Sequence, residues 1–251
     1  MLETKEVTIQ FGGLTAVNKA SIKVFDGKIN ALIGPNGAGK TTLFNAISGV
    51  YVPNSGEVIL DGKHLEGKRG FQICDAGISR TYQIINLFWK MSVLDNVRIG
   101  MTTRIKLSFW DNLFNTKKNR ESEKASYDKA MELLKFVGLE DYANDRASSL
   151  SYGQQRLLEI VRGLASDPKI ILLDEPAAGM NTKEKAELDV LLRKILARGV
   201  TILVVEHDMK LVMNVADYIY VLCNGAVLAE GTPKEIQANP AVIEAYLGGD
   251  E

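Results

Sequence analysis

Apolar residues recur along this chain with two different periods, and each period predicts a different kind of element. Three segments near the N-terminus alternate apolar and polar positions, which is typical of half-buried antiparallel strands. They are residues 6–11, 20–25 and 57–63. Four other segments are short and almost continuously apolar, as strands buried on both faces are. These four are residues 28–34, 169–176, 200–208 and 218–225.

Helical periodicity follows three of the four buried strands, in residues 39–49, 182–199 and 208–217. Alternation of strand and helix predicts an α/β core with a parallel sheet. From about residue 83 to residue 166 the strand patterns give way to helical ones, such as residues 121–138. We therefore expect one domain over residues 1–251. Its α/β core and antiparallel β part would be formed by residues 1–82 and 167–251, and residues 83–166 would be an inserted helical subdomain.

Composition narrows the function classes. The 251 residues are 46% apolar and 24% charged with a net charge of -1, which gives no reason to expect a nucleic-acid partner. Cys74 and Cys223 are too few for a disulfide framework, which suits a reducing cytosol. The first residues lack a signal-peptide pattern, and the longest apolar runs have the length of strands. We expect that the chain does not enter a membrane by itself.

The strongest chemical signal is "GPNGAGKTT", which matches G-x-x-x-x-G-K-[ST] between a predicted strand and a predicted helix. Its glycines let the backbone aim N–H groups at an anion, and the helix dipole favours phosphate at the same place. Lys40 would reach the β- and γ-phosphates, and the Thr41 hydroxyl would ligate Mg²⁺. The alternative is an ordinary glycine-rich turn with an exposed lysine. The predicted phosphate-binding residues are Gly34, Pro35, Asn36, Gly37, Ala38, Gly39, Lys40, Thr41 and Thr42.

Two carboxylates follow the buried strand "IILL", at the edge where α/β folds place their ligands. Asp174 fits a place in the second shell of Mg²⁺, and Glu175 fits a residue that polarises the attacking water. The alternative is a strand that ends in a solvated acidic turn. Pro176 and the small residues after it favour close contact with a ligand instead.

Three further residues are candidates for the same site. His207 follows the apolar strand "TILVVE" and is predicted to contact the γ-phosphate. Gln83 stands where the α/β pattern gives way to helices, and its amide is able to sense both Mg²⁺ and the attacking water. Phe11 is a candidate for stacking on a purine, with a buried strand-end residue as the alternative.

The segment "LSYGQQR" precedes a helical pattern and presents a second anion-seeking helix start. Ser151 is a favourable N-cap residue, and Gly153 would permit a phosphate to approach. Because the phosphate loop already holds one nucleotide tail, a second such helix points to a sandwich. In that arrangement each chain offers its Ser151 helix to the nucleotide of another. The alternative is a capped helix with an exposed start.

With these motifs in this order, the chain resembles an ATP-binding subunit of an ABC transporter over nearly all its residues. The resemblance implies an ATPase with a P-loop NTPase core of ABC type, and Glu175, Gln83 and His207 as catalytic residues. It also implies an ATP-sandwich dimer in which the signature residues of one chain complete the site of its partner. The signature residues are Ser151, Tyr152, Gly153 and Gln154, and Tyr152 replaces the first of the two glycines usual in the family.

Finer features resemble the ATPase subunits of branched-chain amino acid uptake systems. These features are "FGGLTAVN", "RTYQ", "LSYGQQRLLEIVRG", "DEPAAGMN", "VEHDMKLVM" and "NPAVIEAYLG". The subfamily implies Mg-ATP as substrate and a sister ATPase, or a second copy, as dimer partner. It further implies two membrane permeases, an extracytoplasmic binding protein and a place at the cytoplasmic face of the membrane.

Other functions stay open at this point. Related chains serve urea or amide uptake, and the transported molecule is not readable from these residues. A soluble regulatory or repair ATPase is disfavoured, because the chain carries neither a long coiled-coil pattern nor a tandem cassette. A phosphate-loop GTPase would need an N/T-K-x-D element in a late position, which we do not find.

The insertion at residues 101–126 mixes aromatic and basic residues. Phe109, Trp110 and Phe114 either pack inside the helical subdomain or help to dock a permease loop. The family implies a docking groove near Gln83, which residues 88–97 would line.

Overall fold

The chain divides into two compact units, each described here by itself. The computed structural model describes residues 1–102 and 117–247. Met1–Arg80 and Lys169–Glu251 form the first unit, and Thr81–Pro168 form the second. Within the described ranges, no helix combines the length and the apolar character that a membrane crossing requires.

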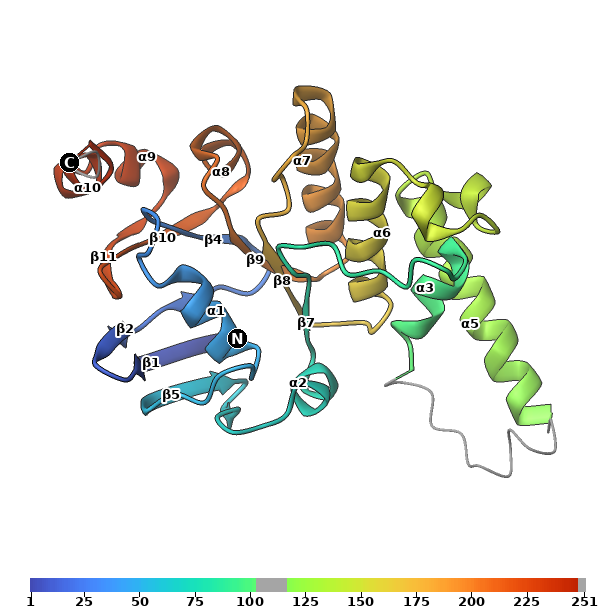
Figure 1. Ribbon diagram of the computed structural model, residues 1–251, viewed down its shortest axis with the longest axis horizontal. Coiled ribbons are helices and arrows are strands. Elements are labelled where there is room, and N and C mark those ends of the chain that lie inside the picture. The colour runs from blue at the N-terminus through green and yellow to red at the C-terminus, as the bar shows by residue number, and fades with distance from the viewer. Residues whose placement is uncertain (103–116, 248–251) are drawn as a thin grey trace. The chain divides into compact units, whose positions relative to one another are not determined.

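A six-stranded sheet is the centre of the first unit (Figure 1), with strand order β11-β10-β4-β9-β8-β7. The strands from β10 to β7 run parallel, and β11 pairs antiparallel with β10. Every residue of β4, β8 and β9 is buried, so the predicted two-sided burial of these strands is confirmed. The strands are β4 (Ile29–Ile33), β7 (Ile78–Arg80), β8 (Ile170–Asp174), β9 (Thr201–Val205), β10 (Tyr218–Cys223) and β11 (Ala226–Gly231).

The second sheet is antiparallel, with order β2-β1-β5-β6 and with β3 paired to β1. The expectation of one strand over residues 20–25 is wrong, because β2 ends at Ala20 and β3 begins at Lys23. The Thr4 hydroxyl fills the break: it donates to the Ala20 carbonyl at 3.1 Å and accepts from the Ile22 N–H at 2.9 Å. The strands are β1 (Leu2–Phe11), β2 (Leu14–Ala20), β3 (Lys23–Val24), β5 (Ser55–Leu60) and β6 (Lys63–His64).

Helices cover both faces of the parallel sheet (Figure 1). Helix α1 lies between this sheet and the antiparallel strands, whereas α7 and α8 lie on the opposite face. Apolar residues of both sheets and of α1, among them Val58, Phe44 and Leu172, form one buried cluster, so the core holds α1 in place. The three helices expected after buried strands are confirmed. The helices of this unit are α1 (Lys40–Ile47), α2 (Gly70–Ala76), α7 (Thr182–Ala197), α8 (Met209–Val215), α9 (Pro233–Gln237) and α10 (Pro240–Leu247).

The second unit is helical across its described residues. Its elements are α3 (Val93–Ile99), α5 (Lys117–Phe136), α6 (Tyr152–Leu164) and the short 3₁₀ helices η1 (Glu140–Tyr142) and η2 (Ala147–Ser149). Helix α3 packs against both α5 and α6, and apolar residues such as Val97, Leu133 and Leu158 are fully or almost fully buried. Phe109, Trp110 and Phe114 lie outside the described residues.

Candidate functional site

One pocket of about 550 Å³ in the first unit collects most of the predicted nucleotide-binding residues. It opens beside the start of α1 and takes its walls from four places: the β1–β2 turn, the phosphate loop, the end of β8 and the turn between β10 and β11. The lining residues are Phe11, Leu14, Thr15, Ala16, Asn36, Gly37, Ala38, Gly39, Lys40, Thr41, Thr42, Glu175, Asn224 and Gly225.

The phosphate loop connects the buried strand β4 to α1 and is packed too tightly for larger residues. Gly39 has φ of +96°, and a Cβ there would lie 2.4 Å from the Ala16 carbonyl oxygen. A Cβ on Gly34 would lie 2.1 Å from the Leu222 carbonyl oxygen. On Gly37, in contrast, a Cβ would meet no atom within 4 Å. Neighbouring backbone therefore excludes a Cβ at Gly34 and Gly39 but not at Gly37.

Lys40 folds back onto its own loop. Its Nζ donates to the carbonyl oxygens of Gly34 at 2.6 Å and Pro35 at 2.9 Å, and the residue is only 8% exposed. Burial lowers the pKa of Lys40, while the negative charge of Glu175 opposes that shift. The alternative of an exposed lysine on an ordinary turn is therefore wrong.

Asp174 is held by Arg80, a residue that the motifs did not single out. Arg80 Nη2 donates to Asp174 Oδ2 at 2.8 Å, and Nη1 reaches Asn45 Oδ1 at 2.7 Å and Ser48 Oγ at 2.6 Å on α1. Asp174 is 2% exposed, so the alternative of a solvated acidic turn is wrong for this residue. The guanidinium ties the end of β8 to the helix that follows the phosphate loop.

Glu175 lines the pocket with an unusual backbone. Its φ is +46°, in the left-handed region that non-glycine residues seldom occupy, and its N–H donates to the Val205 carbonyl at 2.9 Å. The Glu175 carboxylate lies 3.6 Å from Nδ1 of His207, which is itself exposed. The geometry brings the two predicted catalytic side chains together at the C-terminal ends of β8 and β9.

A second buried acid, Glu206, supports these two residues and was missed by the sequence analysis. Glu206 is 1% exposed and accepts the Ala177 N–H at 2.8 Å and the His207 N–H at 3.3 Å. Burial raises the pKa of Glu206, against the opposing effect of these hydrogen bonds. The side chain links the loop after Glu175 to His207. Its position inside the apolar run "LVVEH" was the available signal.

Phe11 stands at the mouth of the pocket and is 46% exposed, so the alternative of a buried core residue is wrong. Its ring meets Tyr51 edge to face, with the ring centroids 5.2 Å apart. The contact fixes the Phe11 ring from one side. Stacking on a purine stays a prediction.

The predicted Mg²⁺ ligands of the first unit are oxygen donors, which fits Mg²⁺. Thr41 lines the pocket and Asp174 lies at the end of β8, which are hard oxygen donors of the kind Mg²⁺ prefers. Across the described residues, no group of three or more His, Cys, Asp or Glu side chains is arranged to hold a metal. The third predicted ligand, Gln83, belongs to the second unit.

In the second unit, Ser151 caps helix α6, as predicted. Its Oγ accepts the Gln154 N–H at 3.4 Å, and the Gln154 side chain accepts the Ser151 N–H at 2.9 Å. Ser151 and Tyr152 are exposed, whereas Gly153 is buried. The capped helix start thus presents Ser151 and Tyr152 outward.

Gln83 lies in a segment without helix or strand, and its side chain is exposed. Its carbonyl oxygen accepts a hydrogen bond from Arg156 Nη2 at 2.8 Å. Arg156 is the last residue of "LSYGQQR", and the sequence analysis assigned it no role.

Comparison with known proteins gives a consistent picture. The family model for "ABC transporter" matches residues 17–178, and that for "Branched-chain amino acid ATP-binding cassette transporter" matches residues 226–251. The chain is 45% identical over 249 residues to the high-affinity branched-chain amino acid transport ATP-binding protein LivG of Escherichia coli (strain K12), covering 99% of this chain and 98% of LivG.

Two solved structures extend the comparison. An ATP-binding cassette of an ABC transporter in its ADP conformation has a TM-score of 0.86 and 34% identity, covering 99% of this chain and 98% of that one. A dimeric cassette in a post-hydrolysis state, bound to ADP and Pi, has a TM-score of 0.77 and 27% identity, covering 93% and 99%. These likenesses bear out the predicted fold class of an ABC-type α/β cassette.

Proposed function

This chain belongs to the ABC transporter family, and from that premise we propose that it is the ATPase that powers a membrane importer of branched-chain, hydrophobic amino acids. The observation that carries the proposal is the pocket at the start of α1, where Lys40 and Glu175 face one cavity. The likeness to LivG along nearly the whole chain supports the transported class.

The pocket provides the parts that phosphoryl transfer requires, which are mainly positioning and charge. Lys40 exchanges the carbonyls of Gly34 and Pro35 for the β- and γ-phosphates, which restores solvation of a buried ammonium. Glu175 accepts a hydrogen bond from the attacking water and thereby polarises it. His207, beside Glu175, contacts the γ-phosphate.

Mg²⁺ bound with ATP would neutralise phosphate charge. Thr41 would ligate it directly, and Asp174 would act through a hydrogen-bonded water. Gln83 as a further ligand stays a prediction. Arg80 keeps the Asp174 carboxylate oriented. Phe11 would stack on the adenine.

A dimer completes the site. Ser151, Tyr152, Gly153 and Gln154 of one chain meet the nucleotide of a partner, which is a sister ATPase or a second copy. The capped, outward-facing start of α6 supports this arrangement, because a helix N-terminus favours anions. A dimeric cassette among similar structures supports it as well.

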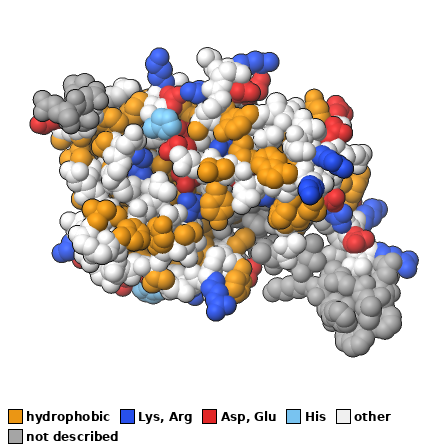
Figure 2. Space-filling model, viewed as in Figure 1, with side chains coloured by type: hydrophobic (Ala, Val, Ile, Leu, Met, Phe, Trp, Pro, Cys, Tyr) orange, Lys and Arg blue, Asp and Glu red, His pale blue; other side chains and the backbone are white. Residues whose placement is uncertain are grey.

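The transporter partners are two permeases and, beyond the membrane, a substrate-binding protein, which would place the chain at the cytoplasmic face. Residues near Gln83 would receive a permease loop, since Ile84, Phe88 and Trp89 are exposed apolar side chains. Apolar side chains (orange) also reach the surface elsewhere on the face drawn in Figure 2, so exposure alone does not select this segment. The family resemblance supplies the reason for choosing it.

An uptake experiment tests the proposal. In the source cell, the chromosomal gene is replaced by the Glu175→Gln variant, and uptake of labelled leucine and of labelled urea is compared with that of the parent strain. We expect leucine uptake to fall about 100-fold or more, because hydrolysis supplies the energy, while urea uptake stays unchanged. A matched replacement of the exposed Glu187 by Gln should leave leucine uptake unaffected.

If the Glu175→Gln strain lost urea uptake but kept normal leucine uptake, the chain would instead be assigned to a urea or amide transporter. Normal uptake of both, together with recovery of the chain away from membranes, would favour a non-transport ATPase of the same family.

A further inference from the structure

Arg156 is a fully buried guanidinium on helix α6, five residues after the N-cap Ser151. Its Nη1 donates to the Tyr82 carbonyl at 2.8 Å and its Nη2 donates to the Gln83 carbonyl at 2.8 Å. The same Nη1 meets Glu159 Oε2 at 2.7 Å, one helical turn further along. A planar guanidinium is suited to such a fork, because its donors have fixed directions.

Glu159 completes the clamp from the same helix. The residue is 1% exposed, and its Oε1 accepts the Asn86 N–H at 3.4 Å. Burial raises the pKa of Glu159, and the positive charge of Arg156 opposes that shift. The Arg156–Glu159 pair therefore holds Tyr82, Gln83 and Asn86 through hydrogen bonds to their backbone.

The segment that contains Tyr82, Gln83 and Asn86 has no regular secondary structure. Thr81–Lys90 forms neither helix nor strand, so ladder hydrogen bonds do not define its shape. Further along the segment, the fully buried Asn96 accepts the Phe88 N–H at 2.9 Å and donates to the Phe88 carbonyl at 3.1 Å. Ile85 and Leu87 are buried, at 8% and 4% exposed. Loss of Arg156 would remove two hydrogen bonds that hold the backbone of Tyr82 and Gln83.

We propose that Arg156 and Glu159 are positioning residues that fix the backbone of Gln83 to the signature helix, so that Gln83 and Ser151 keep one mutual geometry. This inference rests on the proposed function of those two residues. A residue that senses Mg²⁺ and the attacking water would then be coupled, through two side chains of one helix, to the residue that meets the partner's nucleotide. Neither Arg156 nor Glu159 need touch the nucleotide.

The test separates positioning from folding. The double variant Arg156→Met with Glu159→Leu replaces a buried ion pair by apolar side chains of similar size, an exchange that proteins often tolerate in stability. It also removes every donor to the carbonyls of Tyr82 and Gln83 that Arg156 supplies. The control is the exposed helical pair on α7, changed in the same way as Lys183→Met with Glu187→Leu. Each protein is assayed for thermal unfolding, for ATPase kcat and KM, and for amide hydrogen exchange of residues 82–87.

We expect the double variant to unfold near the wild-type temperature. Its kcat should fall about 10- to 100-fold with KM for ATP changed less than about threefold, because Gln83 is mispositioned rather than absent. Hydrogen exchange in residues 82–87 should be about 10-fold faster or more, without ATP present. The single variant Arg156→Lys offers only a point charge to the two carbonyls. Its kcat and its exchange rate should lie between those of wild type and the double variant. This variant still tests the proposal if the double variant fails to fold.

Unchanged kcat and unchanged exchange in a folded double variant, or in Arg156→Lys, would overturn the inference. Faster exchange with an unchanged kcat would also overturn it, because Gln83 would then not need the clamp. A wild-type chain that hydrolyses no ATP would instead overturn the proposed function, and the exchange measurement would still decide whether the clamp exists.

Discussion

The two units of this chain use their charged residues in different ways. In the first unit, Lys40 and Glu175 border a pocket and are placed to meet a ligand directly. In the second unit, Arg156 and Glu159 are buried and bind each other and the backbone of a loop. Both sets lie within sequence motifs. Only Lys40 and Glu175 have a predicted role in binding or hydrolysing a nucleotide that follows from the motif itself.

The difference shows that one motif contains both residues that contact a ligand and residues that hold those contacts in place. Residues that contact substrate must face a cavity, so their chemistry constrains their type and position. Residues that hold those contacts in place need only a buried polar partner, such as a carbonyl oxygen, which any residue offers. Arg80 and Glu206 show that the first unit contains supports of this second kind as well.

The largest expected effect comes from removing a ligand-facing charge. Lys40→Ala should weaken ATP binding about 100-fold or more, because the ammonium that meets the phosphates is lost from a partly buried site. Equilibrium binding of a fluorescent ATP analogue measures this change. The control Lys5→Ala, at an exposed lysine on β1, should bind as the wild type does. Equal affinity in Lys40→Ala would remove the phosphate-loop assignment.

A smaller effect is expected from removing a buried support in the same unit. Arg80→Ala deletes hydrogen bonds to Asp174, Asn45 and Ser48 and leaves a buried carboxylate without that cation. We expect the free energy of unfolding to fall by about 3 kcal/mol, as for other broken buried ion pairs.

Urea denaturation of Arg80→Ala beside Lys183→Ala tests this expectation. Lys183 pairs with Glu187 on the surface, and its loss should cost about 0.5 kcal/mol or less. An equal loss of unfolding free energy in the two variants would mean that the buried Arg80–Asp174 pair stabilises the fold no more than a surface pair does. Arg80 would then not be a structural support.

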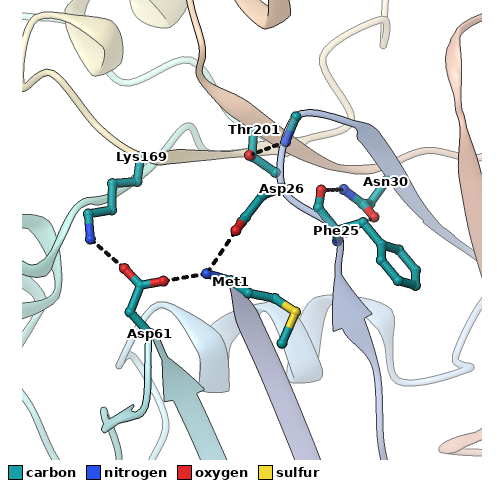
Figure 3. A network of polar contacts seen from close by, with 8 residues as sticks. Met1, Phe25, Asp26, Asn30, Asp61, Lys169 and Thr201 are labelled. Carbon is teal, nitrogen blue, oxygen red and sulfur yellow. Dashed lines mark hydrogen bonds and ion pairs between the residues drawn. The ribbon is translucent and has the colours of Figure 1, made fainter.

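The smallest effect is expected in an ion-pair network of the first unit that lies outside the pocket lining. Asp61 contacts both Lys169 and the amino group of Met1 (Figure 3). Its hydrogen bonds to Lys169 and to that amino group lower the pKa of Asp61 to about 2. A depressed carboxyl pKa stabilises the fold above the unfolded-state pKa near 3.9, and this contribution is lost as the pH falls toward 2.

Because the Asp61 side chain is partly exposed, solvent screening limits its contribution to about 1 kcal/mol or less. Asp61→Asn should therefore unfold more easily than wild type near neutral pH, and the difference should shrink at about pH 3. Chemical denaturation at both pH values measures it. A difference that is the same at both would assign the effect to something other than the Asp61 charge.

Much of the fold was predictable because its strands are strongly apolar. The runs that became β4, β8, β9 and β10 admit few alternatives. β7 was missed because three residues are too few to show a period, and β2 and β11 because much of each strand is exposed. Thr4 explains the wrong strand over residues 20–25, since a single hydroxyl replaces ladder hydrogen bonds that no pattern reveals.

The candidate site was predictable to the same extent. Residues with ligand chemistry, such as Lys40 and Glu175, stand in motifs whose spacing reflects a strand, a loop and a helix. Arg156 and Glu159 were not singled out, because neither stands at a position where the motif predicts contact with a ligand. The available signal was that Arg156 lies four residues before the buried Ile160, on the apolar face of α6. Which carbonyls it reaches depends on tertiary packing.

Glu175 should drive hydrolysis of the ATP bound in this pocket, and the Glu175→Gln variant separates binding from hydrolysis. Purified wild type and Glu175→Gln are compared side by side for Mg-ATP binding and for phosphate release. We expect equal binding within about threefold and a turnover at least about 100-fold slower in the variant, because the carboxylate acts on the attacking water rather than on nucleotide affinity. Near wild-type turnover in Glu175→Gln would show that Glu175 does not polarise the attacking water.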